Sequence, residues 1–179
     1  MPSDTLYALC AVASDANAVR RVFDVKGREG GRPLPLFVSN LAMAERVGVF
    51  DKRSRRLAAR FWPGQLTLVV KKQPGNESEA LAGGETVGLR VPDNAIALAV
   101  IEGVGEAVTG TSANLSGGAD PVSADEVTRQ IGDRLDLIID AGQARIGVAS
   151  TIVDCTGAAP RILREGVVSK EEIEEALGE

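Results

Sequence analysis

The sequence GTSANLSGG at residues 110–118 follows a short apolar run, Ala107-Val108, which is typical of the end of a strand. These nine residues contain three hydroxyl side chains, one carboxamide and three glycines. Glycine lets the backbone approach a ligand closely, and Ser, Thr and Asn add hydrogen-bonding groups without bulk. Such a loop suits an oxyanion, phosphate above all. The same composition also occurs in turns that cap their own backbone, and the stretch matches no P-loop or dinucleotide fingerprint.

The composition of the chain restricts the partners that it can bind. The sequence has 179 residues, 44% of them hydrophobic, with a net charge of −5 and a pI of about 4.9. That length is sufficient for one domain with its own core, and the acidic balance argues against broad, sequence-independent binding to nucleic acid. Histidine is absent, which excludes His-based triads, His zinc sites and His general bases.

The termini and the cysteines indicate a cellular location. No apolar run is long enough to cross a bilayer, and the N-terminal sequence MPSD lacks the cationic and apolar parts of a signal peptide. The two cysteines, Cys10 and Cys155, lie far apart in apolar surroundings. They are predicted to be buried free thiols, and a single bridge between them is the alternative. We therefore expect a cytoplasmic protein without a membrane segment.

Hydrophobic periodicity and capping residues predict a mixture of helices and strands. Helices are expected at residues 15–26, 41–47, 52–61, 94–101, 123–131 and from 169 onwards, and strands at 34–38, 66–70, 87–91, 135–139, 150–154 and 161–164. Gly27 is expected to end the first helix, and Ser123 with Glu126 to form a capping box. No repeat or linker interrupts the sequence, so we expect one α/β domain over residues 1–179, with a twisted, mixed β-sheet and flanking helices.

Five short segments place cations or small hydrogen-bond donors beside a glycine or a strand end. They are Ser3-Asp4-Thr5, Lys26-Gly27-Arg28, Arg90, residues 111–114, and Ser150-Thr151 with Arg164. Gathered in one pocket they would bind a polyanion, and phosphoryl or nucleotidyl transfer needs little beyond positioning and positive charge. Each also has a structural explanation. Lys26 can complement a helix dipole, Arg28 can be a solvated loop residue, and Arg90 can lie on an edge strand.

The order and spacing of seven segments resemble the YrdC-like family of threonylcarbamoyl-AMP synthases. The segments are PSDTLYAL (2–9), KGREGGRPLPL (26–36), WPGQLTLVV (62–70), VGLRVPDN (87–94), TSANLSG (111–117), STIVD (150–154) and ILREG (162–166). The most diagnostic pair is K-x-R followed by S-x-N. In this sequence the pair consists of Lys26 with Arg28, and of Ser112 with Asn114.

The resemblance implies an enzyme that converts L-threonine, bicarbonate and ATP into threonylcarbamoyl-AMP and pyrophosphate, for threonylcarbamoyladenosine modification of tRNA. A downstream threonylcarbamoyl transferase and tRNA would be indirect partners. The residues implied to bind ATP are Lys26, Arg28, Arg32, Ser112, Asn114 and Arg164, with Lys26 and Arg28 as catalytic residues, and those implied to bind threonine are Thr5, Arg90 and Ser150. Lys and Arg suit this chemistry because charge develops on the phosphates. Mg²⁺ is expected to arrive with ATP, since no carboxylate cluster indicates a dedicated metal site.

Two interpretations of Lys26 differ in the effect of removing its side chain. At an exposed helix end it would interact with the helix dipole, worth roughly 0.3–1 kcal/mol. As a phosphate ligand it would contribute on the order of 2.7–4 kcal/mol to transition-state stabilisation. The sequence therefore predicts that Lys26→Ala changes thermal stability little and removes most of the turnover of ATP to pyrophosphate.

The sequence departs from the family pattern at three points. Ala8 replaces the usual glycine of the first motif, and Asn94 stands where a histidine is often found. Family members usually have a helix and a strand before the first motif, whereas this sequence begins at that motif. We therefore expect an exposed sheet edge near residues 5–12 unless another segment or a neighbouring molecule covers it. No further domain follows in the sequence, which predicts the single-domain form.

Two other functions fit parts of the sequence. A carbamoyl transferase of the same fold would use the site for other carbamoyl chemistry, although such domains usually occur in longer chains. An RNA-binding module is the alternative from another class, because relatives have been associated with double-stranded RNA. Its basic patch would consist of Lys52, Arg53, Arg55, Arg56 and Arg60. Such a run is also typical of the solvated face of a helix, and the acidic pI opposes RNA binding.

Overall fold

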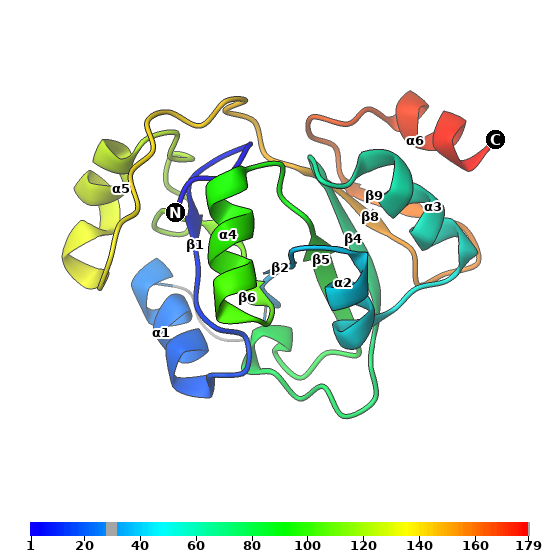
Figure 1. Ribbon diagram of the computed structural model, residues 1–179, viewed down its shortest axis with the longest axis horizontal. Helices are drawn as coiled ribbons and strands as arrows, with labels where there is room; N and C mark the ends of the chain where they lie inside the picture. The colour runs from blue at the N-terminus through cyan, green and yellow to red at the C-terminus, as the bar shows by residue number, and fades with distance from the viewer. Residues whose placement is uncertain (28–31, 179) are drawn as a thin grey trace.

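Within residues 1–27 and 32–178, which the computed structural model describes, seven strands form one mixed sheet (Figure 1). Its order is β6-β2-β5-β4-β8-β9, and β3 also pairs with β4. The strands are β2 (Leu36–Phe37), β3 (Gly48–Val49), β4 (Leu66–Lys72), β5 (Thr86–Arg90), β6 (Val108–Thr109), β8 (Thr151–Asp154) and β9 (Arg161–Arg164). The pairs β2–β5 and β4–β8 are parallel, and the other pairs are antiparallel. The mixed α/β architecture predicted from the sequence is thereby confirmed.

The helices begin where the sequence offers a capping side chain. They are α1 (Ala16–Lys26), α2 (Leu41–Val47), α3 (Lys52–Phe61), α4 (Ala95–Val104), α5 (Ala124–Ile131) and α6 (Lys170–Leu177), with short 3₁₀ turns at Glu79–Leu81 and Gly132–Arg134. Asp15 caps α1, and Gly27 ends it in the left-handed region at φ 59°. The Asn94 side chain accepts hydrogen bonds from the first turn of α4, so this residue has a structural role as an N-cap. Across the described residues, no helix is both long and apolar enough to span a membrane.

The capping box predicted for α5 forms only in part. The Ser123 hydroxyl accepts a hydrogen bond from the Glu126 N–H, but the Glu126 carboxylate accepts one from Val122 instead of Ser123. In α6, by contrast, Ser169 and Glu172 form the complete reciprocal box.

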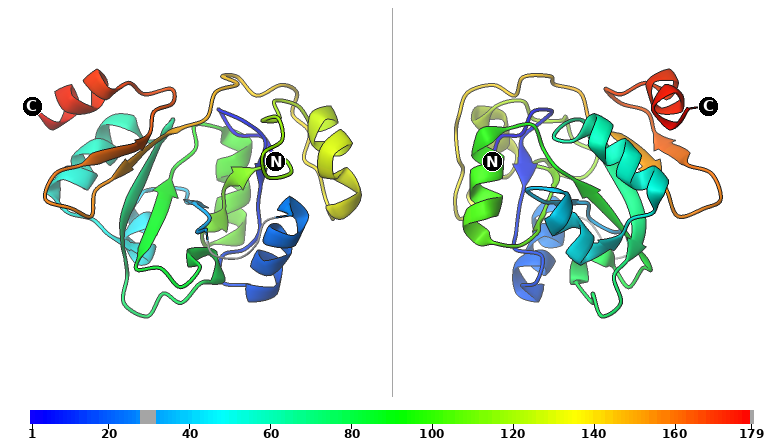
Figure 2. Two further views of the ribbon diagram at one scale, coloured as in Figure 1. Left: turned by 180° about the vertical axis from the view of Figure 1, so that it is seen from behind. Right: turned by 45° about the vertical axis from the view of Figure 1, so that its right-hand side comes forward.

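The helices are unevenly distributed around the sheet. In Figure 1, α4 crosses in front of the sheet, with α2 and α3 beside it. Seen from behind, β4 and β5 are directly visible (Figure 2). The helices α1 and α5 lie beyond the β6 edge, next to the N-terminal segment, while α6 packs near α3 (Figure 1).

A row of leucines across the central strands forms the middle of the core. Leu89 in β5 lies opposite both Leu36 in β2 and Leu68 in β4, and each is at most 1% exposed. Leu57 of α3 and Ile101 of α4 are fully buried in the same cluster. Burial of such a side chain stabilises the fold by about 1.5–3 kcal/mol each. This packing fixes the end of β5 against the start of β4, where the cavity described below opens.

The N-terminal segment, whose edge was expected to be exposed, pairs along one side with the rest of the chain. The short strand β1 (Ala8–Leu9) pairs antiparallel with β7 (Thr111–Ser112), and Val12 then bridges Val108 of β6. Two further hydrogen bonds, from Ala13 N–H to the Ala107 carbonyl and from Thr109 N–H to the Ala11 carbonyl, measure 3.0 and 2.8 Å. Residues 8–13 therefore pair along one side with β7 and β6, and the cover expected over their other side stays a prediction.

Two expectations from the sequence are wrong. Residues 135–139 form no strand: they are irregular, and Leu137 is 75% exposed. An apolar run becomes a strand only where another strand completes its hydrogen-bond ladder, and none of the described strands pairs with this segment. The second correction concerns the cysteines. Both are free thiols as predicted, but only Cys155 is buried, and Cys10 is half-buried.

Candidate active site

A cavity of about 250 Å³ opens where β5 ends and where β4 and β8 begin. Its walls come from the N-terminal segment, the loop before β2, the loop after β6, and the strands β8 and β9. The polar residues of its lining are Ser3, Thr5, Thr67, Arg90, Thr111, Ser112, Asp120, Ser150 and Arg164. A larger cavity of about 370 Å³ beside α1 is lined mainly by aliphatic side chains and lacks such a convergence of polar groups. The smaller cavity is therefore the candidate active site.

The cavity unites many of the side chains that the sequence indicates. Its lining includes the predicted residues Thr5, Arg90, Ser112, Ser150 and Arg164. Lys26 and Asn114 contact the Ser112 loop but do not line the cavity. Arg32 is exposed and directly precedes Pro33 of the cavity wall. Arg28, predicted to be catalytic, lies outside the described residues.

Arg90 is buried at the end of β5, with 3% of its surface exposed. Its Nε donates to the Gly64 carbonyl at 2.8 Å, Nη1 to Thr5 Oγ1 at 2.9 Å, and Nη2 to Asp4 Oδ1 at 2.6 Å. The guanidinium also lies 5.5 Å from the centre of the Phe37 ring. Burial lowers the pKa of Arg90, and the ion pair with Asp4 opposes this shift. Because β5 lies between β2 and β4, the interpretation of Arg90 as an exposed edge residue is excluded.

Ser150 and Arg164 form a second polar wall. The buried Ser150 Oγ lies 3.0 Å from Thr67 Oγ1 of β4. Arg164, at the end of β9, donates through Nε and Nη2 to the Ser150 carbonyl at 3.1 and 2.8 Å. Burial lowers the pKa of Arg164, and the Asp120 carboxylate opposes this shift. The charge of Arg164 also contributes to the lowered pKa of Arg90. The two guanidinium groups that line the cavity therefore both give it positive charge.

Lys26 holds the loop at residues 110–118 in place through hydrogen bonds. This side chain is 4% exposed, and its Nζ lies 2.6 Å from the Ser112 carbonyl, and 3.1 and 3.0 Å from the backbone and side-chain oxygens of Asn114. The Ser112 hydroxyl donates to that same side-chain oxygen at 2.8 Å. Lys26 is therefore a buried residue and not an exposed helix end, so a larger loss of stability on its removal is now expected than the small change predicted from the sequence.

Gly110 permits a close contact between this loop and an aromatic ring. A Cβ atom at this position would lie 2.4 Å from a ring carbon of Phe37, closer than any side chain tolerates. Phe37 itself lines the cavity and carries the Arg90 guanidinium over its face. The absence of a Cβ atom at Gly110 therefore lets the loop backbone pack closely against the Phe37 ring of the protein itself.

The sequence reasoning missed three polar residues of the site. Asp4 belongs to a quoted motif but was given no role, although it is the ion-pair partner of Arg90. The β-former pattern of residues 66–70 predicts only a strand for Thr67, and the signal for a site residue is its hydroxyl in an otherwise aliphatic strand. Asp120 carries no local signal, since its place beside Arg164 depends on the tertiary fold.

No metal site is evident in the described parts of the chain. Among residues 1–27 and 32–178, no three or more Cys, Asp or Glu side chains lie together in a way that would hold an ion. The donors around the cavity are mainly hydroxyl and guanidinium groups, which suit anions better than cations.

The comparisons with known proteins settle the family. Residues 1–166 match the family model of Sua5, YciO and YrdC proteins, described as telomere recombination. The chain belongs to this family. The resemblance to YrdC-like proteins predicted from the seven segments is thereby confirmed.

Relatives from this family resemble the chain over its whole length. A threonylcarbamoyl-AMP synthase from Bacillus subtilis is 37% identical over 179 residues, covering 99% of this chain and 52% of the relative. The synthase from Pyrococcus abyssi is 40% identical over 179 residues, covering 99% and 53%. A crystal structure of P. abyssi Sua5 complexed with L-threonine superposes with a TM-score of 0.95 at 39% identity, covering 99% of this chain and 52% of that one. The chain therefore spans about half the length of these relatives.

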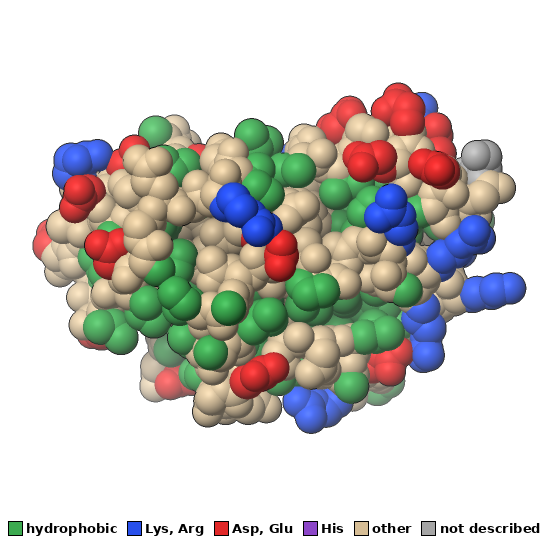
Figure 3. Space-filling model, turned by 45° about the horizontal axis from the view of Figure 1, so that its top comes forward, with side chains coloured by type: hydrophobic (Ala, Val, Ile, Leu, Met, Phe, Trp, Pro, Cys, Tyr) green, Lys and Arg blue, Asp and Glu red, His purple; other side chains and the backbone are tan. Residues whose placement is uncertain are grey.

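The alternative of an RNA-binding module depends on the basic side chains of α3. The basic side chains of α3 lie at one side of the surface in Figure 3, below the acidic side chains of α6. Arg53 pairs with the N-cap carboxylate of its own helix at 3.0 Å, and Arg55 with Glu45 at 3.0 Å. Arg56 donates to the Leu177 carbonyl at the end of α6. These contacts give the helix a structural role, and RNA binding stays a prediction.

Proposed function

We propose that this chain is the catalytic domain of a threonylcarbamoyl-AMP synthase. The observation that carries the proposal is the cavity lined by Thr5, Arg90 and Ser150, within a fold that superposes at a TM-score of 0.95 on a relative complexed with L-threonine. The alternative of a carbamoyl transferase shares the fold, but no feature of this cavity favours it over the synthase.

Arg90 is the proposed ligand of the threonine carboxylate. A guanidinium has five N–H donors, and three of those in Arg90 are engaged by Gly64, Thr5 and Asp4. One N–H on each terminal nitrogen is left for the cavity, which suits a carboxylate with its two oxygens. The hydroxyls of Thr5 and Ser150 line the same cavity and are the proposed partners of the other polar groups of threonine.

The Ser112 loop and Arg164 form the proposed nucleotide side of the cavity. Ser112 and Arg164 line it directly, while Lys26 and Asn114 hold the loop in shape and place a positive charge behind it. Arg28 and Arg32, which follow the end of α1 in the sequence, remain proposed phosphate ligands. Arg28 and Lys26 remain the proposed catalytic residues, because charge develops on the α-phosphate and on the departing pyrophosphate.

The proposed reaction has two steps. First, the threonine amine attacks the carbon of bicarbonate, a C–N bond forms, and water leaves, giving the N-carboxylate. Second, an oxygen of this carboxylate attacks the α-phosphorus of ATP. A new P–O bond forms, the bond to the β-phosphate oxygen breaks, and pyrophosphate departs with the electron pair. Arg164 and the Ser112 loop, with Lys26 behind it, would stabilise the negative charge that develops on the phosphates.

Other partners follow from the proposed reaction. Mg²⁺ would enter with ATP, bound mainly by its phosphates, because the described residues offer no carboxylate cluster. A threonylcarbamoyl transferase would then consume the product and modify tRNA. The cytoplasm is the proposed location, and the two unpaired thiols suit its reducing conditions.

Isotope transfer tests this function. With ATP, L-threonine and ¹⁴C-bicarbonate, the proposal expects pyrophosphate release and a labelled adenylate in equal amounts. Omission of threonine or of bicarbonate should reduce both signals to background. Pyrophosphate release that continues without threonine would contradict the proposal.

A further inference from the structure

Gln65 is a half-buried residue that the proposed reaction does not use. Its Nε2 donates a hydrogen bond to Asp4 Oδ2 at 2.7 Å, and Asp4 Oδ1 accepts one from Arg90 Nη2 at 2.6 Å. The backbone carbonyl of Gln65 accepts a hydrogen bond from the Thr151 N–H at 3.0 Å. Gln65 is therefore fixed at the starts of β4 and β8 and is linked to Arg90 through one carboxylate.

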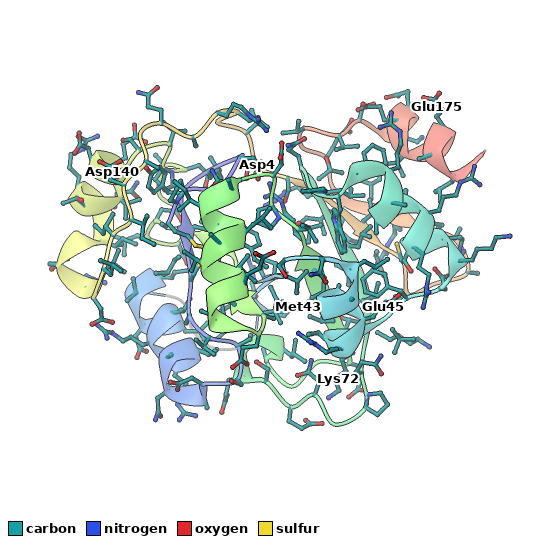
Figure 4. The ribbon with its side chains drawn as sticks, in the orientation of Figure 1. Asp4, Met43, Glu45, Lys72, Asp140 and Glu175 are labelled. Atoms are coloured by element: carbon teal, nitrogen blue, oxygen red, sulfur yellow. The ribbon has the colours of Figure 1, made fainter. Side chains whose placement is uncertain are left out.

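The Asp4 carboxylate depends on both of these partners. Its side chain is fully buried, and Figure 4 places it near the N-terminal end of α4. A buried carboxylate oxygen without a donor costs considerable free energy. Arg90 satisfies one oxygen and Gln65 the other. Without Gln65, one oxygen of the carboxylate would lose its donor, and rotation toward another donor would move the oxygen that holds Arg90.

The peptide at Gly64–Gln65 also contacts Arg90 directly. Arg90 Nε donates to the Gly64 carbonyl at 2.8 Å. The same peptide therefore holds Nε directly, and it holds Nη2 indirectly, because the Gln65 side chain donates to the Asp4 carboxylate that accepts from Nη2. The plane of the guanidinium is thus fixed at two ends by neighbouring residues. The direction of its two remaining N–H groups is therefore fixed as well.

We propose that Gln65 is a positioning residue that sets the affinity of this site for the substrate carboxylate, by holding Asp4 and through it Arg90. The proposal rests on the proposed function in taking threonine as the carboxylate ligand. Gln65 touches no substrate in this scheme, and its effect reaches the cavity through two hydrogen bonds in series.

A purely structural role for Gln65 is the competing explanation, and the chain offers a matched control. Gln73 directly follows β4, as Gln65 directly precedes it, and is also half-buried. Its Nε2 donates to the Glu45 carbonyl at 2.8 Å, away from the cavity. Gln73→Met and Gln65→Met make the same change of side chain and each remove a side-chain amide donor, from backbone carbonyls in the case of Gln73 and from a carboxylate in the case of Gln65.

Calorimetric titration with L-threonine, without ATP, measures the predicted difference. Gln65→Met should raise the Kd for threonine by about tenfold, the effect of one buried hydrogen bond, while the KM for ATP stays within about twofold of that of the unmodified protein. Gln73→Met should leave the Kd for threonine unchanged, even if both variants lower the Tm. Equal Kd values for Gln65→Met and the unmodified protein would overturn the proposal.

Gln65→Glu gives a second readout that a structural role would not produce. A protonated carboxyl at position 65 can donate to Asp4, whereas two ionised carboxylates at this distance repel each other. The charged groups around them are Arg90, Arg145 and Arg164, which stay protonated, and Asp93, which is paired with Arg145. The Kd for threonine should therefore rise at least tenfold between about pH 5 and 8 in this variant and change little in the unmodified protein.

The outcomes separate the two proposals. An unmodified protein that binds no threonine would contradict the proposed function and with it the role of Gln65. An unmodified protein that binds threonine, with a flat pH profile in Gln65→Glu and an unchanged Kd in Gln65→Met, would contradict only the positioning role.

Discussion

The ammonium group of Lys26 donates a hydrogen bond to the side-chain oxygen of Asn114 at 3.0 Å, joining residues 88 positions apart. The Ser112 hydroxyl donates to the same oxygen at 2.8 Å. The two sequence motifs K-x-R and S-x-N therefore meet at a single atom. The nitrogen of that carboxamide donates onward to the Gly118 carbonyl at 2.9 Å, which closes the loop upon itself. The same hydrogen bonds therefore set both the shape of the loop and the position of the Lys26 charge.

Replacement of Lys26 should affect stability and turnover together. Lys26→Ala leaves three oxygens of the loop without their cationic donor, and we expect a loss of about 2–3 kcal/mol in the free energy of unfolding. Turnover of ATP to pyrophosphate should fall roughly a hundredfold to a thousandfold. Urea unfolding and a pyrophosphate assay measure the two effects. Lys71→Ala, at an exposed position of β4, is the control and should change neither.

An unchanged unfolding free energy in Lys26→Ala would contradict the bracing role, and near-normal turnover would remove the phosphate-site assignment. Each measurement tests a different part of this role, because a loop held in shape by other contacts could still lack the charge that the phosphates need.

The ion pair between Asp4 and Arg90 should be far more important to stability than surface pairs. Asp4→Asn leaves a buried guanidinium without its counter-charge, and such a change typically costs about 3–5 kcal/mol. Asp93→Asn removes one partner of the exposed pair with Arg145 and should cost less than about 1 kcal/mol. Denaturant titration of the two variants gives the comparison, and equal losses would show that the Asp4 pair is not energetically special.

Gly110→Ala should disturb the wall of the cavity. The added Cβ would meet the Phe37 ring at 2.4 Å, so the loop or the ring must move, at a cost of about 1–3 kcal/mol. Threonine affinity should fall as well, because Phe37 lies beneath Arg90. Gly103→Ala in α4 is the matched control, since its Cβ would meet nothing within 4 Å. If Phe37→Leu in the same chain does not relieve the effect of Gly110→Ala, the contact is not its cause.

Local signals explain why many helix boundaries could be predicted. Asp15 caps α1 and Gly27 ends it through contacts within a few residues, and the α6 box needs only Ser169 and Glu172. The strand expected at residues 135–139 failed because pairing is a property of two segments, and the apolar pattern describes only one.

The candidate site could be predicted only as a set of residues. Motif spacing identified Thr5 and Arg90 as members, but not the Asp4 carboxylate between Arg90 and Gln65. Those contacts join residues 61 to 86 positions apart, and no periodicity or cap signals them. The burial of Lys26 was likewise hidden, because a lysine at a helix end is exposed by default.

Threonine should be preferred over serine as the acceptor amino acid. The cavity of about 250 Å³ has an apolar part formed by residues such as Pro35, Phe37 and Ile152, which can contact a methyl group. A methyl group in a fitted pocket is worth only about 1–3 kcal/mol, so the ratio of kcat/KM values should lie between roughly 10 and 200. Competition assays with both amino acids measure this ratio, and equal efficiencies would exclude a fitted methyl pocket.

The two thiols should make stability fall with rising pH. Burial raises the pKa of Cys155 from 9.0 to about 12, with Asp51 and Asp154 adding to the shift, and raises that of Cys10 to about 11. Below pH 9 both the folded and the unfolded thiols are protonated, and neither changes the stability. Above it the unfolded chain ionises first and therefore binds fewer protons, so the free energy of unfolding should decrease up to about pH 11, by at most about 1.4 kcal/mol per pH unit for each thiol. Cys155→Ala should have a visibly flatter slope between pH 9 and 11 in urea titrations. An identical slope in the variant and the unmodified chain would show that this thiol ionises as readily in the fold as in water.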